Sequence, residues 1–238
     1  MTIDEGGFAK VGLATIIMLK GLIFDLDGVL TDSARFHLQA WNDLATQIGI
    51  SLPPEANAAL RGRSRQDSLA IILGYGGQDN RYSDAEKQAL AAKKNQHYQQ
   101  LIQTMTPADI LPGILPLLND AKAAGLKMAI ASASRNAPTI LKQLHLEGYF
   151  DGIVDPASLH KGKPDPEIFV KAAQTLALPA ASVASFEDAP AGVAAIKAAN
   201  QFAVGIGSAT LLAEADYVVP DTGALRLADV VAAFDQTV

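Results

Sequence analysis

The sequence predicts an α/β protein with a Rossmann-like parallel-sheet core and an inserted α-helical cap domain. Three observations lead to this fold class. Short aliphatic runs alternate with helical patterns over most of the chain, which is typical of a parallel sheet covered by helices. One long stretch is helical throughout and interrupts that alternation. The 238 residues, 49% of them hydrophobic, suffice for one large domain or two small ones.

The predicted strands are short apolar runs followed by turn or cap residues. The first is LIFD at 22–25. Further strands are expected at 127–132, 182–186 and 202–207, with a weaker candidate at 151–155. Because all of these runs are short and rich in aliphatic residues, they are predicted to be buried in one parallel sheet.

Helical patterns separate these strands. They are expected at 114–125, 137–148, 166–178 and 191–200, and the first two end on a glycine, which is a common helix stop. The α/β core is therefore assigned to residues 18–33 and 107–238.

The helical stretch at 34–106 is expected to be an insert that follows the first strand. Its predicted helices are FHLQAWNDLATQIGI, PEANAALRG, RQDSLAIILGYG and SDAEKQALAAKKNQHYQQLIQTM. Residues 1–17 are expected to be an extension, because MLKGLIFD opens directly into the first strand and makes Met18 a candidate start.

Composition excludes several classes of function. The net charge of −6 argues against a nucleic-acid partner. No run approaches the roughly 18 apolar residues of a membrane span, and the N-terminus lacks the cleavage site of a signal peptide. The absence of cysteine excludes disulfides and thiolate metal sites. A cytoplasmic protein without a membrane partner is expected, and nothing demands more than a monomer.

Polar side chains follow several of the predicted strands. Ligands of an open parallel sheet bind beyond the carboxyl ends of its strands. The residues expected at that edge are Asp25 and Asp27, then Ser132, Ser134, Arg135 and Asn136, then Lys163 in KGKPDP, and finally Glu187 and Asp188. They would converge on one site.

Each of these residues alone also has a purely structural explanation. Asp25 and Asp27 suit a turn with Asx hydrogen bonds. Ser134 and Asn136 suit helix N-caps, and Lys163 suits a solvated loop. Glu187 and Asp188 suit the positive end of the next helix. Four such coincidences at one sheet edge are much less expected than any single one.

Taken together, the residues suit phosphoryl transfer. Carboxylate oxygens are the ligands that Mg²⁺ prefers, and the metal offsets the repulsion among the acids. Lysine and main-chain amides at a helix start bind phosphate oxygens. Asp25 is then a candidate nucleophile that forms an aspartyl phosphate. Asp27, displaced into the loop, is a candidate general acid and base.

Four segments carry a resemblance to a known family. FDLDGVLTD, SASRN, KGKPDPEIF and FEDAPAG resemble, in order, the four motifs of the haloacid dehalogenase superfamily. The helical insert resembles that superfamily's α-helical cap. From Met18 onward the chain is more closely similar to the β-phosphoglucomutase-like subfamily, on segments such as LRGRSRQDSL, AAKKNQHY and TPADILPGI.

The resemblance implies a role for each matching residue. Asp25 would be the nucleophile, Asp27 the acid and base, and Ser132 and Lys163 would bind the transferring phosphate. His37 lies shortly after the hinge and would link cap closure to Asp27. Mg²⁺ would be held by Asp25, the main-chain carbonyl of Asp27, Glu187 and Asp188. The implied substrate-binding residues are Gly62, Arg63, Ser64, Arg65, Lys94, Ser134, Arg135, Asn136 and Trp41.

The chain departs from the family pattern at a few positions. Arg61 stands where lysine is usual, and arginine is a longer planar fork. Arg63 replaces a small or aliphatic residue, so the sugar end of the pocket is expected to differ. Ser33 replaces threonine, and Pro190 replaces a glutamine. Because Glu187 and Asp188 are kept, the metal site is expected to survive.

The resemblance implies an Mg²⁺-dependent mutase that interconverts β-D-glucose 1-phosphate and glucose 6-phosphate through an aspartyl-phosphate enzyme and a bisphosphate intermediate. The alternative is a sugar-phosphate phosphatase of the same superfamily, which shares Asp25 and Asp27 and differs in the acceptor. A third possibility is a non-catalytic binding protein. The presence of Asp27 disfavours this possibility, because a non-catalytic protein on the same scaffold could lose that residue without consequence.

Overall fold

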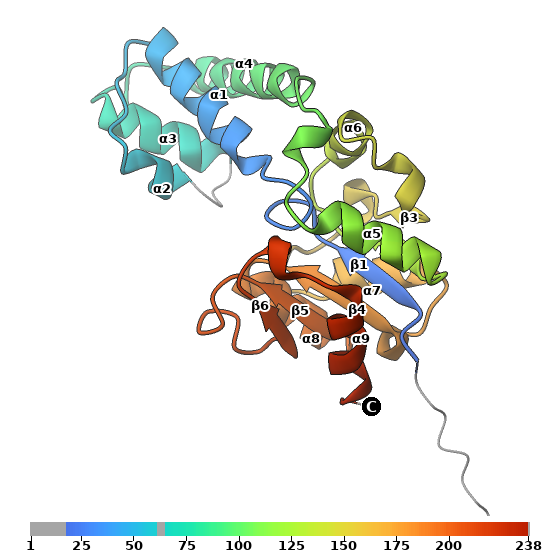
Figure 1. Ribbon diagram of the computed structural model, residues 1–238. Helices are drawn as coiled ribbons and strands as arrows, with labels where there is room; N and C mark the ends of the chain where they lie inside the picture. Colours follow the sequence, from blue (N-terminus) through green and yellow to red (C-terminus); the bar gives the residue numbers. More distant parts are fainter. Residues whose placement is uncertain (1–17, 61–64, 238) are drawn as a thin grey trace, which may run out of the picture.

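A computed structural model describes residues 18–60 and 65–237, and its ribbon is shown in Figure 1. Its centre is a six-stranded sheet with the order β3-β2-β1-β4-β5-β6, in which every strand pairing is parallel. The strands are β1 (Gly21–Phe24), β2 (Lys127–Ile130), β3 (Gly152–Ile153), β4 (Val183–Glu187), β5 (Phe202–Ile206) and β6 (Tyr217–Val219). The predicted fold class, a Rossmann-like parallel sheet, is confirmed.

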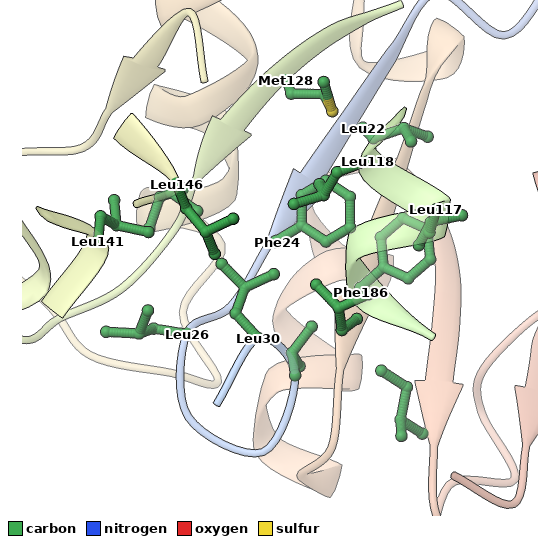
Figure 2. Close-up of a cluster of buried hydrophobic side chains, with 14 of the residues drawn as sticks. Leu22, Phe24, Leu26, Leu30, Leu117, Leu118, Met128, Leu141, Leu146 and Phe186 are labelled. Atoms are coloured by element: carbon green, nitrogen blue, oxygen red, sulfur yellow. The ribbon is translucent and has the colours of Figure 1, made fainter. Parts of the chain in front are cut away.

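Within the described residues, five helices cover the sheet. They are α5 (Ile114–Ala123), α6 (Ala137–Gln143), α7 (Glu167–Thr175), α8 (Pro190–Ala198) and α9 (Leu227–Asp235). Successive residues of a strand point to opposite faces. Leu22 and Phe24 of β1 accordingly pack in one cluster with α5, α6 and α9 (Figure 2). Ile23 packs in a second cluster with α7 and α8. Both faces of the sheet are therefore buried under helices.

A helical region lies apart from the sheet (Figure 1). It contains α1 (Ala34–Gln47), α2 (Ala56–Leu60), α3 (Arg65–Tyr75) and α4 (Asp84–Ile102), with a hydrophobic cluster of its own. The segment before α1 and the segment after α4 connect it to the core. These two segments contact each other: Leu111 N donates to Leu30 O at 2.9 Å, and Thr31 forms a β-bridge with Ile110. This region corresponds to the expected cap, and the domain boundaries at 34 and 106 stay a prediction.

The elements differ from the sequence prediction in four places. The edge strand β6 and the last helix α9 were not predicted. The helix expected over 137–148 is wrong in its second half, since α6 ends at Gln143 and His145 takes a left-handed φ of 57°. The weak strand expected at 151–155 has only two paired residues in β3. None of the helices that the structure describes is both long enough and apolar enough to cross a bilayer.

Candidate active site

The site forms where β1 ends, at the centre of the sheet. The strand order reverses here, because β2 and β4 flank β1 on its two sides, and such switch points open a crevice beyond the strand ends. Asp25 N donates to Phe186 O at 3.1 Å, which fixes Asp25 beside the end of β4. The chain then turns at Gly28, whose φ of 74° is left-handed. Asp25 and Asp27 are thus held at the carboxyl end of β1, beside the end of β4.

Lys163 joins two of the acids. Its Nζ donates to Asp25 Oδ1 at 2.8 Å and to Glu187 Oε1 at 2.5 Å. Burial alone would lower the pKa of Lys163, but the Asp25 and Glu187 carboxylates raise it above its ordinary value. The lysine therefore stays charged, and this mostly buried ammonium offsets part of the negative charge of the site.

The acids carry more negative charge than one lysine offsets. Burial raises the pKa of Asp25 to about 7, although Lys163 acts in the opposite direction. Burial and repulsion from Glu187 and Asp25 raise the pKa of Asp188 to about 7. Carboxyl groups in this state are stabilised by a further cation.

The three carboxylates have the arrangement of a divalent-metal site. Ligand oxygens of Asp25, Glu187 and Asp188 all lie within 4.8 Å of one another. Oxygens about 2.1 Å from a Mg²⁺ ion lie at most about 4.2 Å apart, so small movements would bring this set onto one ion. Glu187 is held in place by its Oε2, which accepts from Asp188 N at 2.7 Å and Ala189 N at 2.9 Å. The residues present therefore fit a divalent cation.

Two glycines make room for these acids. A Cβ on Gly28 would overlap the Asp188 carboxylate, and one on Gly192 would overlap the Glu187 carboxylate. The sequence prediction did not single out either glycine. For Gly192, the signal in the sequence was its place at the end of EDAPAG, because a glycine shortly after paired acids indicates that the main chain comes close to their carboxylates.

Asp27 is held by the first chain segment that leads to the helical region. Its Oδ1 accepts from Ser33 N at 2.9 Å and also from Ser33 Oγ. Burial raises the pKa of Asp27, while the Ser33 contacts oppose that rise. Ser33 is the N-cap residue of α1, yet its side chain makes no cap hydrogen bond. The hydroxyl thus connects Asp27 to the start of α1, a contact that the sequence prediction did not foresee.

The segment after β2 lies at the same edge of the sheet. Ala131 N donates to Phe24 O at 2.8 Å, which sets the end of β2 beside the end of β1. Ser132 is buried and its Oγ accepts from Ser134 N at 3.2 Å, while Ser134 Oγ accepts from Asn136 N at 3.2 Å. Arg135 is exposed.

His37, Trp41 and Lys94 gather inside the helical region. Lys94 is 3% exposed and its Nζ lies 2.7 Å from His37 Nδ1 and 4.7 Å from the centre of the Trp41 ring. His37 stacks on Tyr98 with ring centres 3.7 Å apart. Trp41 is also buried, in the cluster that joins α1 to α3. Substrate binding by Trp41 and Lys94 stays a prediction.

Arg65 begins α3 and is exposed. Its Nη2 donates to Asn95 Oδ1 at 2.8 Å on α4, and its charge contributes to the lowered pKa values of His37 and Lys94 after burial, the larger cause. The guanidinium is therefore near this buried pair. The other predicted cap residues, Arg61, Gly62, Arg63 and Ser64, lie outside the described residues.

The chain is similar to known proteins over most of its length. The family model described as haloacid dehalogenase-like hydrolase matches residues 19–200. A relative from Bacillus subtilis (strain 168), named β-phosphoglucomutase, is 49% identical over 209 residues, which are 88% of this chain and 92% of that protein. A crystal structure of β-phosphoglucomutase from Clostridium difficile superposes with a TM-score of 0.79 at 40% identity, covering 92% of this chain and 99% of that one. A more distant relative from Thermotoga maritima, 28% identical over 76% of this chain and 82% of its own length, is named phosphorylated carbohydrates phosphatase.

Proposed function

The chain belongs to the haloacid dehalogenase-like hydrolases and, within them, to the β-phosphoglucomutase-like subfamily, and from this premise we propose that it is an Mg²⁺-dependent β-phosphoglucomutase. It interconverts β-D-glucose 1-phosphate and glucose 6-phosphate. The observation that carries the proposal is the group of Asp25, Lys163, Glu187 and Asp188 at the end of β1, in a chain 49% identical to a protein of that name.

Asp25 is the proposed nucleophile. One of its carboxylate oxygens attacks the phosphorus of a sugar bisphosphate, the P–O bond to the sugar breaks, and an aspartyl phosphate and a sugar monophosphate result. Lys163 already pairs with Asp25 Oδ1, so its ammonium is close to the oxygens of the transferring phosphoryl group. Ser132, buried at the end of β2, is proposed to donate a hydrogen bond to the same group.

Asp27 is the proposed general acid and base. As a carboxylic acid it protonates the sugar oxygen that leaves the phosphorus. As a carboxylate it then removes the proton from the sugar hydroxyl that attacks the aspartyl phosphate. The raised pKa of Asp27 supports the acid role, and the two Ser33 donors hold the carboxyl group in one orientation.

The metal is proposed to be Mg²⁺, with Asp25, the main-chain carbonyl of Asp27, Glu187 and Asp188 as its protein ligands. When bound, it would offset the charge of the carboxylates and of the phosphoryl oxygens. All the donors are oxygens, which suits Mg²⁺ better than a softer metal. Asp25 Oδ1 and Glu187 Oε1 pair with Lys163, so the other Asp25 oxygen would serve the cation.

The non-reacting phosphate and the sugar need their own ligands. We assign this role to Arg65 on the helical region, to Ser134, Arg135 and Asn136 after β2, and to Gly62, Arg63 and Ser64, with Lys94 and Trp41 as further candidates. Two properties of Arg65 support its assignment: it is exposed, and it lies near a second cation, Lys94. A guanidinium also binds phosphate in a bidentate manner. Closure of the helical cap, with His37 shortly after its hinge, would exclude water from the aspartyl phosphate.

The alternative is a sugar-phosphate phosphatase, a function that the Thermotoga maritima relative carries in its name. A coupled assay with β-glucose 1-phosphate, Mg²⁺ and a trace of β-glucose 1,6-bisphosphate separates the two. A mutase forms glucose 6-phosphate without stoichiometric inorganic phosphate. Release of one inorganic phosphate per sugar phosphate consumed would contradict the mutase and favour the phosphatase. A monomeric state and a cytoplasmic location remain expectations.

A further inference from the structure

Lys163 lies in a loop that has little regular structure of its own. The loop runs from residue 159 to residue 166, between the 3₁₀ turn Pro156–Ser158 and α7. Within it, Asp165 N donates to Gly162 O at 3.0 Å. Yet the Lys163 ammonium is held at hydrogen-bond distance from two different carboxylates. Holding the ammonium at both carboxylates requires the main chain around Lys163 to be fixed by other contacts.

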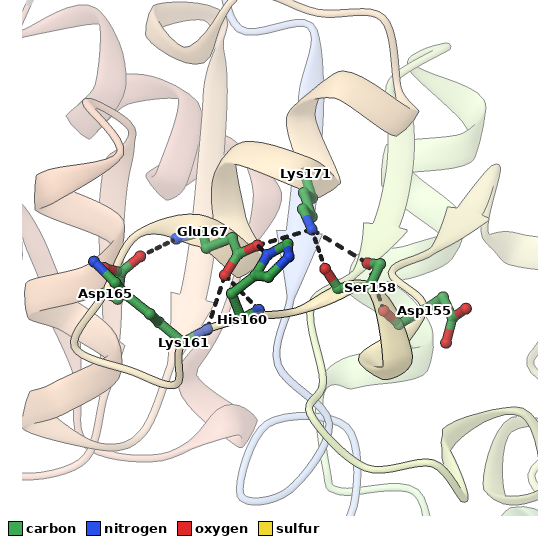
Figure 3. A network of polar contacts seen from close by, with 7 residues as sticks. All are labelled: Asp155, Ser158, His160, Lys161, Asp165, Glu167 and Lys171. Atoms are coloured by element: carbon green, nitrogen blue, oxygen red, sulfur yellow. Dashed lines mark hydrogen bonds and ion pairs between the residues drawn. The ribbon is translucent and has the colours of Figure 1, made fainter.

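One side chain ties the two ends of this loop together. Glu167, the first residue of α7, accepts through Oε2 from the main-chain N–H groups of His160 at 2.8 Å and Lys161 at 2.9 Å. Its Oε1 pairs with Lys171 Nζ at 2.8 Å and with His160 Nδ1 at 2.8 Å. Figure 3 shows these contacts converging on Glu167. The carboxylate thus binds the chain on the other side of Lys163.

The helix that carries Glu167 is firmly anchored. Ile168 and Phe169 follow it directly and are buried in the cluster under the sheet. Gln201 Nε2 donates to Phe169 O at 2.9 Å. Glu167 N itself donates to Asp165 Oδ1 at 3.0 Å. The carboxylate therefore has a fixed position from which to hold residues 160 and 161.

Charge favours the carboxylate in this position. A negative group at the first turn of a helix interacts favourably with the helix dipole. The Lys171 and His160 contacts, followed by the two main-chain donors, hold the pKa of Glu167 well below its usual range. Glu167 is consequently a carboxylate throughout the neutral pH range, with both oxygens accepting.

We propose that Glu167 is a positioning residue for Lys163. By closing the loop at His160 and Lys161, it sets the main chain from which Lys163 reaches Asp25 and Glu187. The inference deepens the proposed function and rests on it, because Lys163 is assigned there to the transferring phosphate. Glu167 itself contacts neither the acids of the site nor the metal ligands among the interactions described.

A double-mutant cycle tests this role. Glu167→Gln is combined with Lys163→Met, and phosphorylation of Asp25 by acetyl phosphate is measured together with sugar-phosphate turnover. If a residue acts only through Lys163, replacing it lowers activity only while Lys163 is present. We expect Glu167→Gln to lower kcat/KM about 10-fold or more in the wild-type background and less than about 2-fold in the Lys163→Met background.

Two further variants serve as controls. Lys171→Met keeps both main-chain hydrogen bonds of Glu167 and should lower activity much less than Glu167→Gln does. Glu147→Gln changes an exposed glutamate outside this network and should leave activity unchanged. If Glu167→Gln does not fold, as judged by circular dichroism, Glu167→Asp replaces it in the cycle under the same criterion.

The outcomes are distinct. Equal losses from Glu167→Gln in both backgrounds would show that it acts on the fold and would overturn the proposal, as would full activity in Glu167→Gln. Failure of the mutase assignment has another signature. Wild-type protein would then release inorganic phosphate in place of glucose 6-phosphate, while the cycle on acetyl phosphate would still report on Lys163, since Lys163 faces Asp25 in either enzyme.

Discussion

Lys94 donates a hydrogen bond to His37 Nδ1 across 2.7 Å, inside the helical region and close to the hinge. Burial is the main cause that lowers the pKa of Lys94 to about 8 and that of His37 to about 4. At neutral pH the lysine is therefore charged and the histidine is neutral, with its proton on Nε2. The pair joins α4 to α1.

The first prediction concerns pH. Burial, Lys94 and Arg65 lower the pKa of His37 from 6.5 to about 4, and the uncharged ring of Tyr98 stacks on its other side. As the pH falls from about 6.5 to about 4, the unfolded chain binds a proton that the folded protein does not, so this histidine decreases the free energy of unfolding over that window. Urea titrations at several pH values should show a smaller acid-side loss for His37→Gln, which retains an acceptor for Lys94. An identical pH dependence in variant and wild type would contradict the neutral His37.

The second prediction concerns the hydroxyl that binds Asp27. Ser33→Ala removes one of two Ser33 donors to Asp27 Oδ1. A hydrogen bond to a charged group contributes about 1.5–3 kcal/mol, so kcat should fall about 10- to 100-fold, with a small change in KM. Ser33→Thr keeps the hydroxyl and is the matched control. Steady-state kinetics of the two variants test whether the Ser33 hydroxyl orients Asp27 for catalysis. Equal activity in Ser33→Ala and Ser33→Thr would contradict that role.

Much of the site could be predicted because parallel strands bring their carboxyl ends to one edge. Asp25 follows β1 and Glu187 ends β4, so pairing of those two strands was enough to bring the acids together. Lys163 was expected at the same edge from its place in the KGKPDP loop, and the family resemblance then implied its role in binding phosphate. The roles of these residues in catalysis stay predictions.

The remainder depends on contacts that sequence patterns do not specify. Lys94 is buried against His37 and Trp41, whereas an isolated lysine is usually exposed. Glu167 looks like an ordinary acid at a helix start, and only the folded loop brings two main-chain donors to it. The strand β6 has three residues at the sheet edge, which is too short for an alternating pattern to be recognised.

The third prediction concerns the distal phosphate. Arg65→Ala should lower kcat/KM on the sugar phosphate about 10- to 10³-fold, because it removes charge-assisted hydrogen bonds to phosphate. Phosphorylation of Asp25 by acetyl phosphate needs no distal contact and should persist. Arg65→Lys should give an intermediate loss, since it keeps the charge and loses the bidentate geometry. Equal losses on acetyl phosphate and on the sugar phosphate would place the effect in the fold or at Asp25 instead.

The fourth prediction concerns room for the metal ligands. Alanine usually stabilises a helix relative to glycine by about 1 kcal/mol, but a Cβ on Gly192, in α8, would overlap the Glu187 carboxylate. Gly192→Ala should displace Glu187 and reduce both activity and the rise in Tm on addition of Mg²⁺. Gly148→Ala is the matched control, because its Cβ meets nothing within 4 Å. Differential scanning fluorimetry with and without Mg²⁺ makes the comparison, and a wild-type Mg²⁺ response in Gly192→Ala would refute the assigned metal site.

The central claim is that Asp25 carries the phosphoryl group and passes it to a sugar and not to water. The most direct test is a single-turnover chase, in which the protein is phosphorylated with ³²P-labelled acetyl phosphate in Mg²⁺ and then mixed with β-glucose 1-phosphate. The account predicts that label leaves Asp25 mainly as sugar bisphosphate, much faster than it is lost without the sugar, and that Asp25→Asn takes up no label. Release of the label as inorganic phosphate at one rate, with or without the sugar, would contradict it.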